Sequence, residues 1–139
     1  MGCDIHMQTE VKIGGVWHHY NEANIPRNYA FFAWLSGVRG DGSEDAVAKS
    51  GIPEDASVVT KALVDDCGVD GHTHGHVTAD QIPLLEDWWS TVMEEWDGYY
   101  YVEKFWGYCF GNSWGGFVRY PEDRSPCVED VRFIFWYDN

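Results

Sequence analysis

The chain has 139 residues and a formal net charge of −14 at pH 7, from 9 Lys and Arg against 23 Asp and Glu. A protein that holds polymeric nucleic acid needs a basic footprint, so this composition argues against polymeric nucleic acid as a partner. A small anionic ligand is compatible with it, because two or three arginines can hold one phosphate. The length predicts a single domain over residues 1–139.

The sequence also indicates where the protein works. No apolar run approaches the roughly 20 residues that span a bilayer, and the start carries no basic region followed by an apolar stretch. We therefore expect a cytoplasmic protein with no membrane partner. The cysteines are widely separated and predict reduced thiols, with Cys67, Cys109 and Cys127 buried as structural residues.

The N-terminal residues predict a β-hairpin. Residues 3–12 alternate with a period of two, which places Cys3 and Ile5 on an apolar face and Asp4 and His6 on a polar face. Gly14-Gly15 then predicts a turn into a second short strand with the sequence VWHHY.

The middle of the chain predicts helices. Pro26 suits the first turn of a helix whose apolar residues follow helical spacing. Residues 40–53 form a long loop. The expected helices run from Pro26 to Gly37 or Gly40, over 55–66 with Gly68 as the end, and from a cap at Thr78 or Asp80 to about Glu95.

The last third predicts β structure. Between Trp96 and Tyr120, 11 of 25 residues are aromatic and several glycines separate them, which is typical of short, twisted strands. Alternatively, some of these rings form a platform on which a nucleobase or another flat ligand stacks. The final DVRFIFWYDN predicts a central strand covered on both faces.

The fold class that follows is α+β, with an N-terminal hairpin, a helical middle and C-terminal aromatic-rich antiparallel strands. If the first and last strands pair antiparallel, Asp138 approaches Asp4 and His6.

The histidines mark a candidate site. Three of the six lie within five residues, at His72, His74 and His76, and in an extended segment they would share one face. His6 with His72 or His74 would supply acid–base catalysis of phosphodiester cleavage, with Asp4 orienting an imidazole. Arg27 or Arg39 would hold the phosphate.

A metal site is the alternative for the same residues. His72 and His74, with His76, His6, Asp4 or Cys3, are ligand types that suit zinc, and an open position would permit hydrolysis by a metal-bound water. The cofactor is then a divalent metal such as zinc, whereas the acid–base mechanism needs none.

Short motifs along the chain resemble those of a family of small proteins encoded by phages and prophages. The motifs are MGCDIH at 1–6, Arg27-Asn28-Tyr29, Gly37-Val38-Arg39, and VRFIFWYDN at 131–139. The chain departs from the family pattern at Tyr137, where relatives have Phe, and at His74 and His76, where serine is expected at one or both. The resemblance implies a phage accessory protein in the host cytoplasm, of a kind that often counters host defence.

Three functional hypotheses follow. The first is hydrolysis of a small phosphodiester or nucleotide signal by histidine acid–base chemistry, the second is a non-catalytic sponge that sequesters a cyclic nucleotide, and the third is an acidic inhibitor of a protein partner. A homo-oligomer is compatible with each. The expected catalytic residues are Asp4, His6, His72 and His74, and the expected ligand-binding residues are Arg27, Asn28, Tyr29, Arg39, Trp136 and Asp138.

Overall fold

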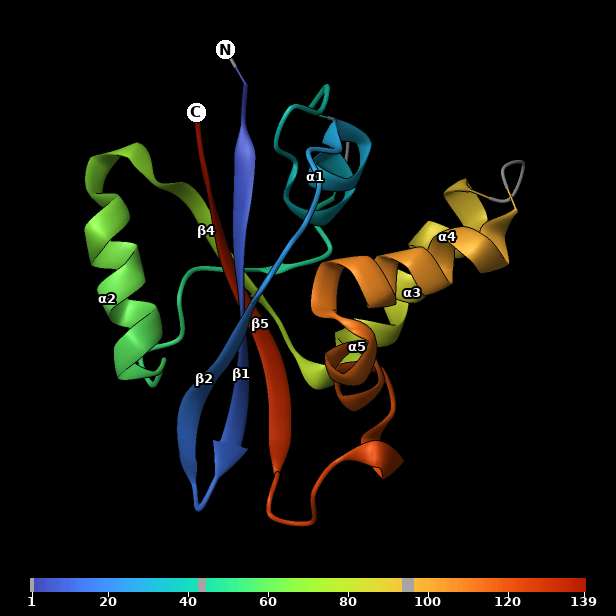
Figure 1. Ribbon diagram of the computed structural model, residues 1–139. Coiled ribbons are helices and arrows are strands. Elements are labelled where there is room, and N and C mark those ends of the chain that lie inside the picture. Colours follow the sequence, from blue (N-terminus) through green and yellow to red (C-terminus); the bar gives the residue numbers. More distant parts are fainter. Residues whose placement is uncertain (1, 43–44, 94–96) are drawn as a thin grey trace.

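The computed structural model describes residues 2–42, 45–93 and 97–139 and is built on one antiparallel sheet (Figure 1). Its five strands lie in the order β2-β1-β5-β4-β3. They are β1 (Asp4–Ile13), β2 (Val16–Ala23), β3 (Lys49–Ser50), β4 (His72–Val77) and β5 (Asp130–Asp138). The predicted hairpin and the central position of the final strand are both confirmed.

The first and last strands pair as expected. In the β1–β5 register Asp4 lies opposite Asp138, and His6 lies opposite Trp136. Both ends of the chain therefore reach the same end of the sheet (Figure 1). The α+β class is confirmed by this sheet together with the helices that separate β2 from β5.

The helices begin and end at recognisable caps. Asn28 and Ser57 cap their helices through side-chain oxygens, and Gly37 ends the first helix with a φ of 74°. The helices are α1 (Tyr29–Ser36), α2 (Val58–Cys67), α3 (Ile82–Val92), α4 (Gly98–Lys104) and α5 (Asn112–Arg119). A π-helical segment at Phe105–Cys109 continues α4, and single 3₁₀ turns occupy Gly68–Asp70, Ala79–Gln81 and Pro121–Asp123.

Several predicted boundaries need correction. Pro26 precedes α1 instead of opening it, and the Thr78–Gln81 capping box caps a 3₁₀ turn ahead of α3. That helix ends at Val92, whereas the expected end at Glu95 lies outside the described residues. Of the three cysteines expected to be buried, Cys109 is buried, Cys67 is half-buried and Cys127 is exposed.

The strand prediction for the aromatic-rich region was wrong, because residues 98–119 are largely helical. The buried side chains there follow helical spacing, at Val102, Phe105, Trp106 and Cys109, and they pack into the core under the sheet. Gly115 lets α5 approach the π-helical segment closely, since a Cβ there would lie 2.6 Å from the carbonyl oxygen of Trp106. Gly115 therefore serves helix packing and not a strand turn.

The two faces of the sheet are covered differently. Helices α1, α3, α4 and α5 lie on one face and α2 lies on the other (Figure 1). The first face carries the apolar core, including Met7, Phe133 and Phe135. On the second face the buried Glu10 accepts hydrogen bonds from Ser57, Thr60 and Arg132, which join the start of α2 to the sheet.

None of the described helices has both the length and the apolar composition needed to cross a bilayer.

Candidate functional site

Several of the predicted site residues gather on the α2 side of the sheet, at the end where both termini lie. We call this surface the histidine face and define it as His6, His74, Trp136 and Asp138. Nε2 of His6 lies 2.9 Å from Oδ2 of Asp138. Its Nδ1 lies 3.8 Å from a carboxylate oxygen of Glu22. Asp138, not Asp4, is therefore the carboxylate that orients His6.

The two expected catalytic imidazoles do not face each other. The rings of His6 and His74 both stack on Trp136, at centroid distances of 5.8 Å and 6.4 Å. Because β5 lies between β1 and β4, the indole of Trp136 separates them. Burial, and then the neighbouring His72, lower the pKa of His74. A phosphodiester flanked by both imidazoles would have to occupy the place of the indole.

His72 and His76 point to different surroundings. The register of β4 against β5 is irregular between His72 and Gly75, and Thr73 there has a φ of 51°. This irregularity breaks the expected common face, so that the ring of His72 stacks on Tyr137 at 6.1 Å. Nδ1 of His76 instead lies 2.8 Å from the carbonyl oxygen of Gly51.

A metal centre built from these residues does not assemble in the described ranges. Among residues 2–42, 45–93 and 97–139, no group of three or more His, Cys, Asp or Glu side chains is placed to hold an ion. Cys3 is fully buried on the apolar face of β1, away from His6.

The cations near the histidine face bind groups of the protein itself. Arg27 donates two hydrogen bonds of 2.9 Å to the carboxylate of Asp4, and the hydrogen bond is the main reason that the pKa of Asp4 is lowered. The guanidinium of Arg39 lies 5.1 Å from the ring centre of Tyr29, and the Tyr29 hydroxyl accepts a hydrogen bond from the backbone of Cys3.

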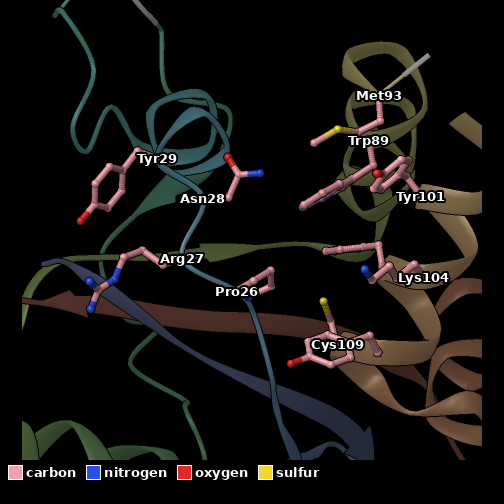
Figure 2. Close-up of a pocket in the computed structure, with 11 residues that line it drawn as sticks. Pro26, Arg27, Asn28, Tyr29, Trp89, Met93, Tyr101, Lys104 and Cys109 are labelled. Carbon is pink, nitrogen blue, oxygen red and sulfur yellow. The ribbon is translucent and has the colours of Figure 1, made fainter. Parts of the chain in front are cut away.

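A second site, which the sequence did not predict, is a cleft of about 650 Å³ on the opposite side of the sheet (Figure 2). It lies between the segment 26–29 on one side and α3, α4 and the π-helical segment on the other. We call it the aromatic cleft. It is lined by Pro26, Arg27, Asn28, Tyr29, Trp89, Met93, Tyr101, Lys104, Phe105, Tyr108 and Cys109.

The segment that forms one wall of the cleft presents its side chains alternately. Figure 2 shows the side chains of Arg27 and Tyr29 turned away from the opposite wall and the amide nitrogen of Asn28 turned toward it. The other amide atom of Asn28, Oδ1, accepts a hydrogen bond from the backbone of Phe31 as the cap of α1. Asn28 therefore contributes an amide N–H group to the cleft.

The helical wall supplies aromatic surface and sulfur. The indole nitrogen of Trp89 is buried and has no hydrogen-bond partner in the described part of the chain. Cys109 is 4% exposed, and burial raises the pKa of its thiol to about 12. It is therefore protonated and unreactive near neutral pH. A π-helical segment is rare and often occurs at a functional site.

The charge of the cleft differs from that of the whole chain. Acidic residues outnumber basic residues by 23 to 9 in the sequence. Among the described residues that line the cleft, however, none is acidic, while Arg27 and Lys104 are cationic. The sequence signals that could have indicated this site are Arg27-Asn28-Tyr29 and the density of aromatic residues after Trp96, but nothing in the sequence places these segments together.

Comparison with known proteins adds no relative: no family model, curated protein or solved structure matches this chain.

Proposed function

We propose that this protein binds a small, flat, anionic ligand of the nucleotide class in the aromatic cleft and holds it without chemical change. The observation that carries the proposal is the composition of the lining, with aromatic walls, the cation Lys104 and no carboxylate among the described lining residues of a strongly acidic chain. The second cation of the lining, Arg27, is paired with Asp4. The cleft volume of about 650 Å³ lies within the range of about 300–1,000 Å³ typical of small-ligand sites.

Electrostatics favours the aromatic cleft over the histidine face for an anion. On the histidine face, His6 lies between the carboxylates of Asp138 and Glu22. A phosphate brought there would meet two negative charges, and the nearest arginine, Arg27, is already paired with Asp4. In the cleft, the other described lining residues are neutral except Arg27, which is paired with Asp4, so that no described lining carboxylate competes with an anion for Lys104.

The lining also favours binding over catalysis. General acid–base chemistry at neutral pH uses side chains such as histidine or a carboxylate within hydrogen-bond reach of the substrate. The described lining of the cleft contains neither, and the thiol of Cys109 is protonated. Aromatic surfaces combined with fixed donors instead suit the retention of a stacked base.

The sequence motifs that resemble phage and prophage accessory proteins support a signalling nucleotide as the ligand. A small protein that retains such a signal lowers its free concentration in proportion to the number of copies present. This sponge activity needs tight binding and no turnover, which agrees with the lining of the cleft.

Hydrolysis by the histidine face is the second candidate function. The hydrogen bond between His6 and Asp138 favours it, because a carboxylate that orients an imidazole is a recurring part of acid–base sites. In this mechanism His6 would act as the single general base, since Trp136 keeps His74 apart from it.

One experiment separates the candidates. The protein is incubated with cyclic di- and trinucleotides, separated from free ligand and heated, and the released nucleotide is analysed by mass spectrometry. Sequestration returns intact ligand, and the Lys104→Met variant retains less of it than the matched surface variant Lys61→Met. Hydrolysis returns cleaved product, and His6→Ala prevents the cleavage.

A third outcome would reject both candidates. If neither intact nor cleaved nucleotide is recovered from any of the incubations, the protein has no small-nucleotide site. The hypothesis of an acidic protein inhibitor, which requires no such ligand, would then be favoured.

A further inference from the structure

The nitrogen groups that the cleft offers to a ligand are hydrogen-bond donors. The ammonium of Lys104, which lines the cleft, can only donate. Asparagine ordinarily can do both, because its amide carries an acceptor oxygen and a donor nitrogen. In this cleft the oxygen of Asn28 is already engaged, so the amide also acts as a donor.

The cap of α1 fixes this orientation of Asn28. Its Oδ1 lies 3.1 Å from the backbone nitrogen of Phe31, which is a donor and requires an acceptor opposite it. Rotating the amide by half a turn would place two N–H groups against each other and leave the start of α1 uncapped. Asn28 therefore cannot adapt to a ligand by exchanging its oxygen for its nitrogen.

Trp89 lines the cleft, but its indole nitrogen is buried and is not exposed to a ligand there. Its residue is 6% exposed, and its Nε1 has no partner in the described part of the chain. A buried donor without a partner lowers stability.

The amide of Asn28 selects among nucleobases. A 6-oxopurine presents two adjacent acceptors, N7 and O6, on one edge, whereas a 6-aminopurine presents the N7 acceptor beside an amino donor. Both N–H groups of Asn28 can therefore pair with a 6-oxopurine, whereas one of them would face the amino donor of a 6-aminopurine and remain unpaired. A purine also covers more of the aromatic wall than a pyrimidine, because stacking gains follow the buried area.

We propose that the aromatic cleft selects a 6-oxopurine nucleotide over a 6-aminopurine nucleotide, and that Asn28 is the residue that determines this selectivity. The inference rests on the proposed function and adds the identity of the base to it. The N-cap oxygen of Asn28 maintains the helix while its amide nitrogen reads the base.

The test compares inosine monophosphate with adenosine monophosphate, because their bases differ only in the oxo or amino group at position 6 and the proton on N1. Calorimetric titration of the wild-type protein should show binding of inosine monophosphate about tenfold tighter or more, since an unpaired buried donor opposes the amino base. Equal affinities, or tighter binding of adenosine monophosphate, would overturn the inference and leave nucleotide binding intact. Binding of neither nucleotide would overturn the proposed nucleotide site itself.

The role of Asn28 is tested with Asn28→Ser. Serine is an equally good helix cap but has no amide donor, so α1 should persist while the preference falls to within about threefold. Far-UV circular dichroism and thermal unfolding check the fold of the variant. Asn24→Ser is the matched control, because Asn24 is exposed on the same connection and lies outside the cleft lining. A preference that persists in Asn28→Ser would show that another group reads the base.

Discussion

The histidine face and the aromatic cleft are two polar-lined surfaces built in different ways. The histidine face stands on paired strands, where the β1–β5 register alone brings His6 beside Asp138. The cleft forms between a capped helix start and three helical segments from the second half of the chain. The difference teaches that a cluster of reactive residue types is not sufficient evidence for a ligand site.

The partners of the charged groups distinguish the two regions further. On the histidine face the imidazoles of His6 and His74 both contact neighbouring side chains, and Arg27 nearby is bound by Asp4. In the cleft, the Trp89 indole nitrogen lacks a partner. Both regions hold a buried indole nitrogen without a partner in the described part of the chain, Trp136 on the histidine face and Trp89 beside the cleft, so that the two regions differ in charge and not in unpaired donors.

The largest expected effect concerns the sheet face that bears the histidines. Glu10→Ala would leave Arg132 as a buried charge that has lost its main partner and would remove the acceptor of Ser57 and Thr60. Breaking one side of a buried ion pair costs about 3–5 kcal/mol. Urea unfolding measures this loss, with the exposed Glu54→Ala as the control. A loss below about 1 kcal/mol would show that α2 is held by apolar contacts instead.

Acid should weaken the same network. Burial alone would raise the pKa of Glu10, but the hydrogen bonds from Ser57, Thr60 and Arg132 outweigh it and hold the pKa below the ordinary 4.5. Because the pKa of Glu10 is lower in the folded than in the unfolded protein, its ionised carboxylate stabilises the fold above the unfolded-state pKa. This stabilisation is lost as the pH falls through the folded-state pKa. The urea midpoint should fall between pH 5 and pH 3, since that is where carboxylates titrate. In Glu10→Gln the urea midpoint should fall less between pH 5 and pH 3 than in the wild type. Equal slopes of the midpoint against pH in the two proteins would show that other carboxylates cause the fall.

The sequence was sufficient to predict the strand elements and their main pairing. The period of two in residues 3–12 and the continuous apolar run at the end identified β1 and β5, because each pattern reflects contacts on the faces of one strand. The proximity of Asp138 to His6 followed from that pairing alone. Periodicity and strand pairing are local or nearly local properties, so they are visible in a single sequence.

The cleft could not be predicted, because no local pattern encodes it. Lys104 and Cys109 were assigned to strands, since the glycines at 98, 107 and 111 hid the helical spacing of the buried rings. Their position across the cleft from Asn28 depends on the packing of α4 against α3, which joins residues far apart in the chain. The partner of Asp4 was missed for a similar reason, because the loop that brings Arg27 to it has no period.

Replacing Lys104 should have a smaller effect, and it tests whether the positive charge of the cleft binds the ligand. Lys104→Met should weaken binding of inosine monophosphate about tenfold, because a charge-assisted hydrogen bond to phosphate is among the stronger polar contacts. Binding of the uncharged nucleoside inosine should not change. Calorimetry measures both, and Lys61→Met on α2 is the control. If nucleoside and nucleotide lose the same affinity, the lysine acts by packing and not by charge.

The smallest expected effect tests whether the two regions are linked through the ion pair of Asp4 and Arg27. Arg27 points away from the cleft, yet it adjoins Asn28, so its bond to Asp4 on β1 fixes the backbone that carries the Asn28 amide (Figure 2). Because the pair is exposed, Arg27→Gln and Asp4→Asn should each weaken nucleotide binding only about two- to fivefold. The double variant should be no weaker than either single one, since both remove one interaction. If Arg27 instead attracted the nucleotide directly, Asp4→Asn would release its guanidinium and tighten nucleotide binding. The sign of the change in affinity of Asp4→Asn, measured by calorimetric titration, therefore shows whether Arg27 positions Asn28 or attracts the ligand.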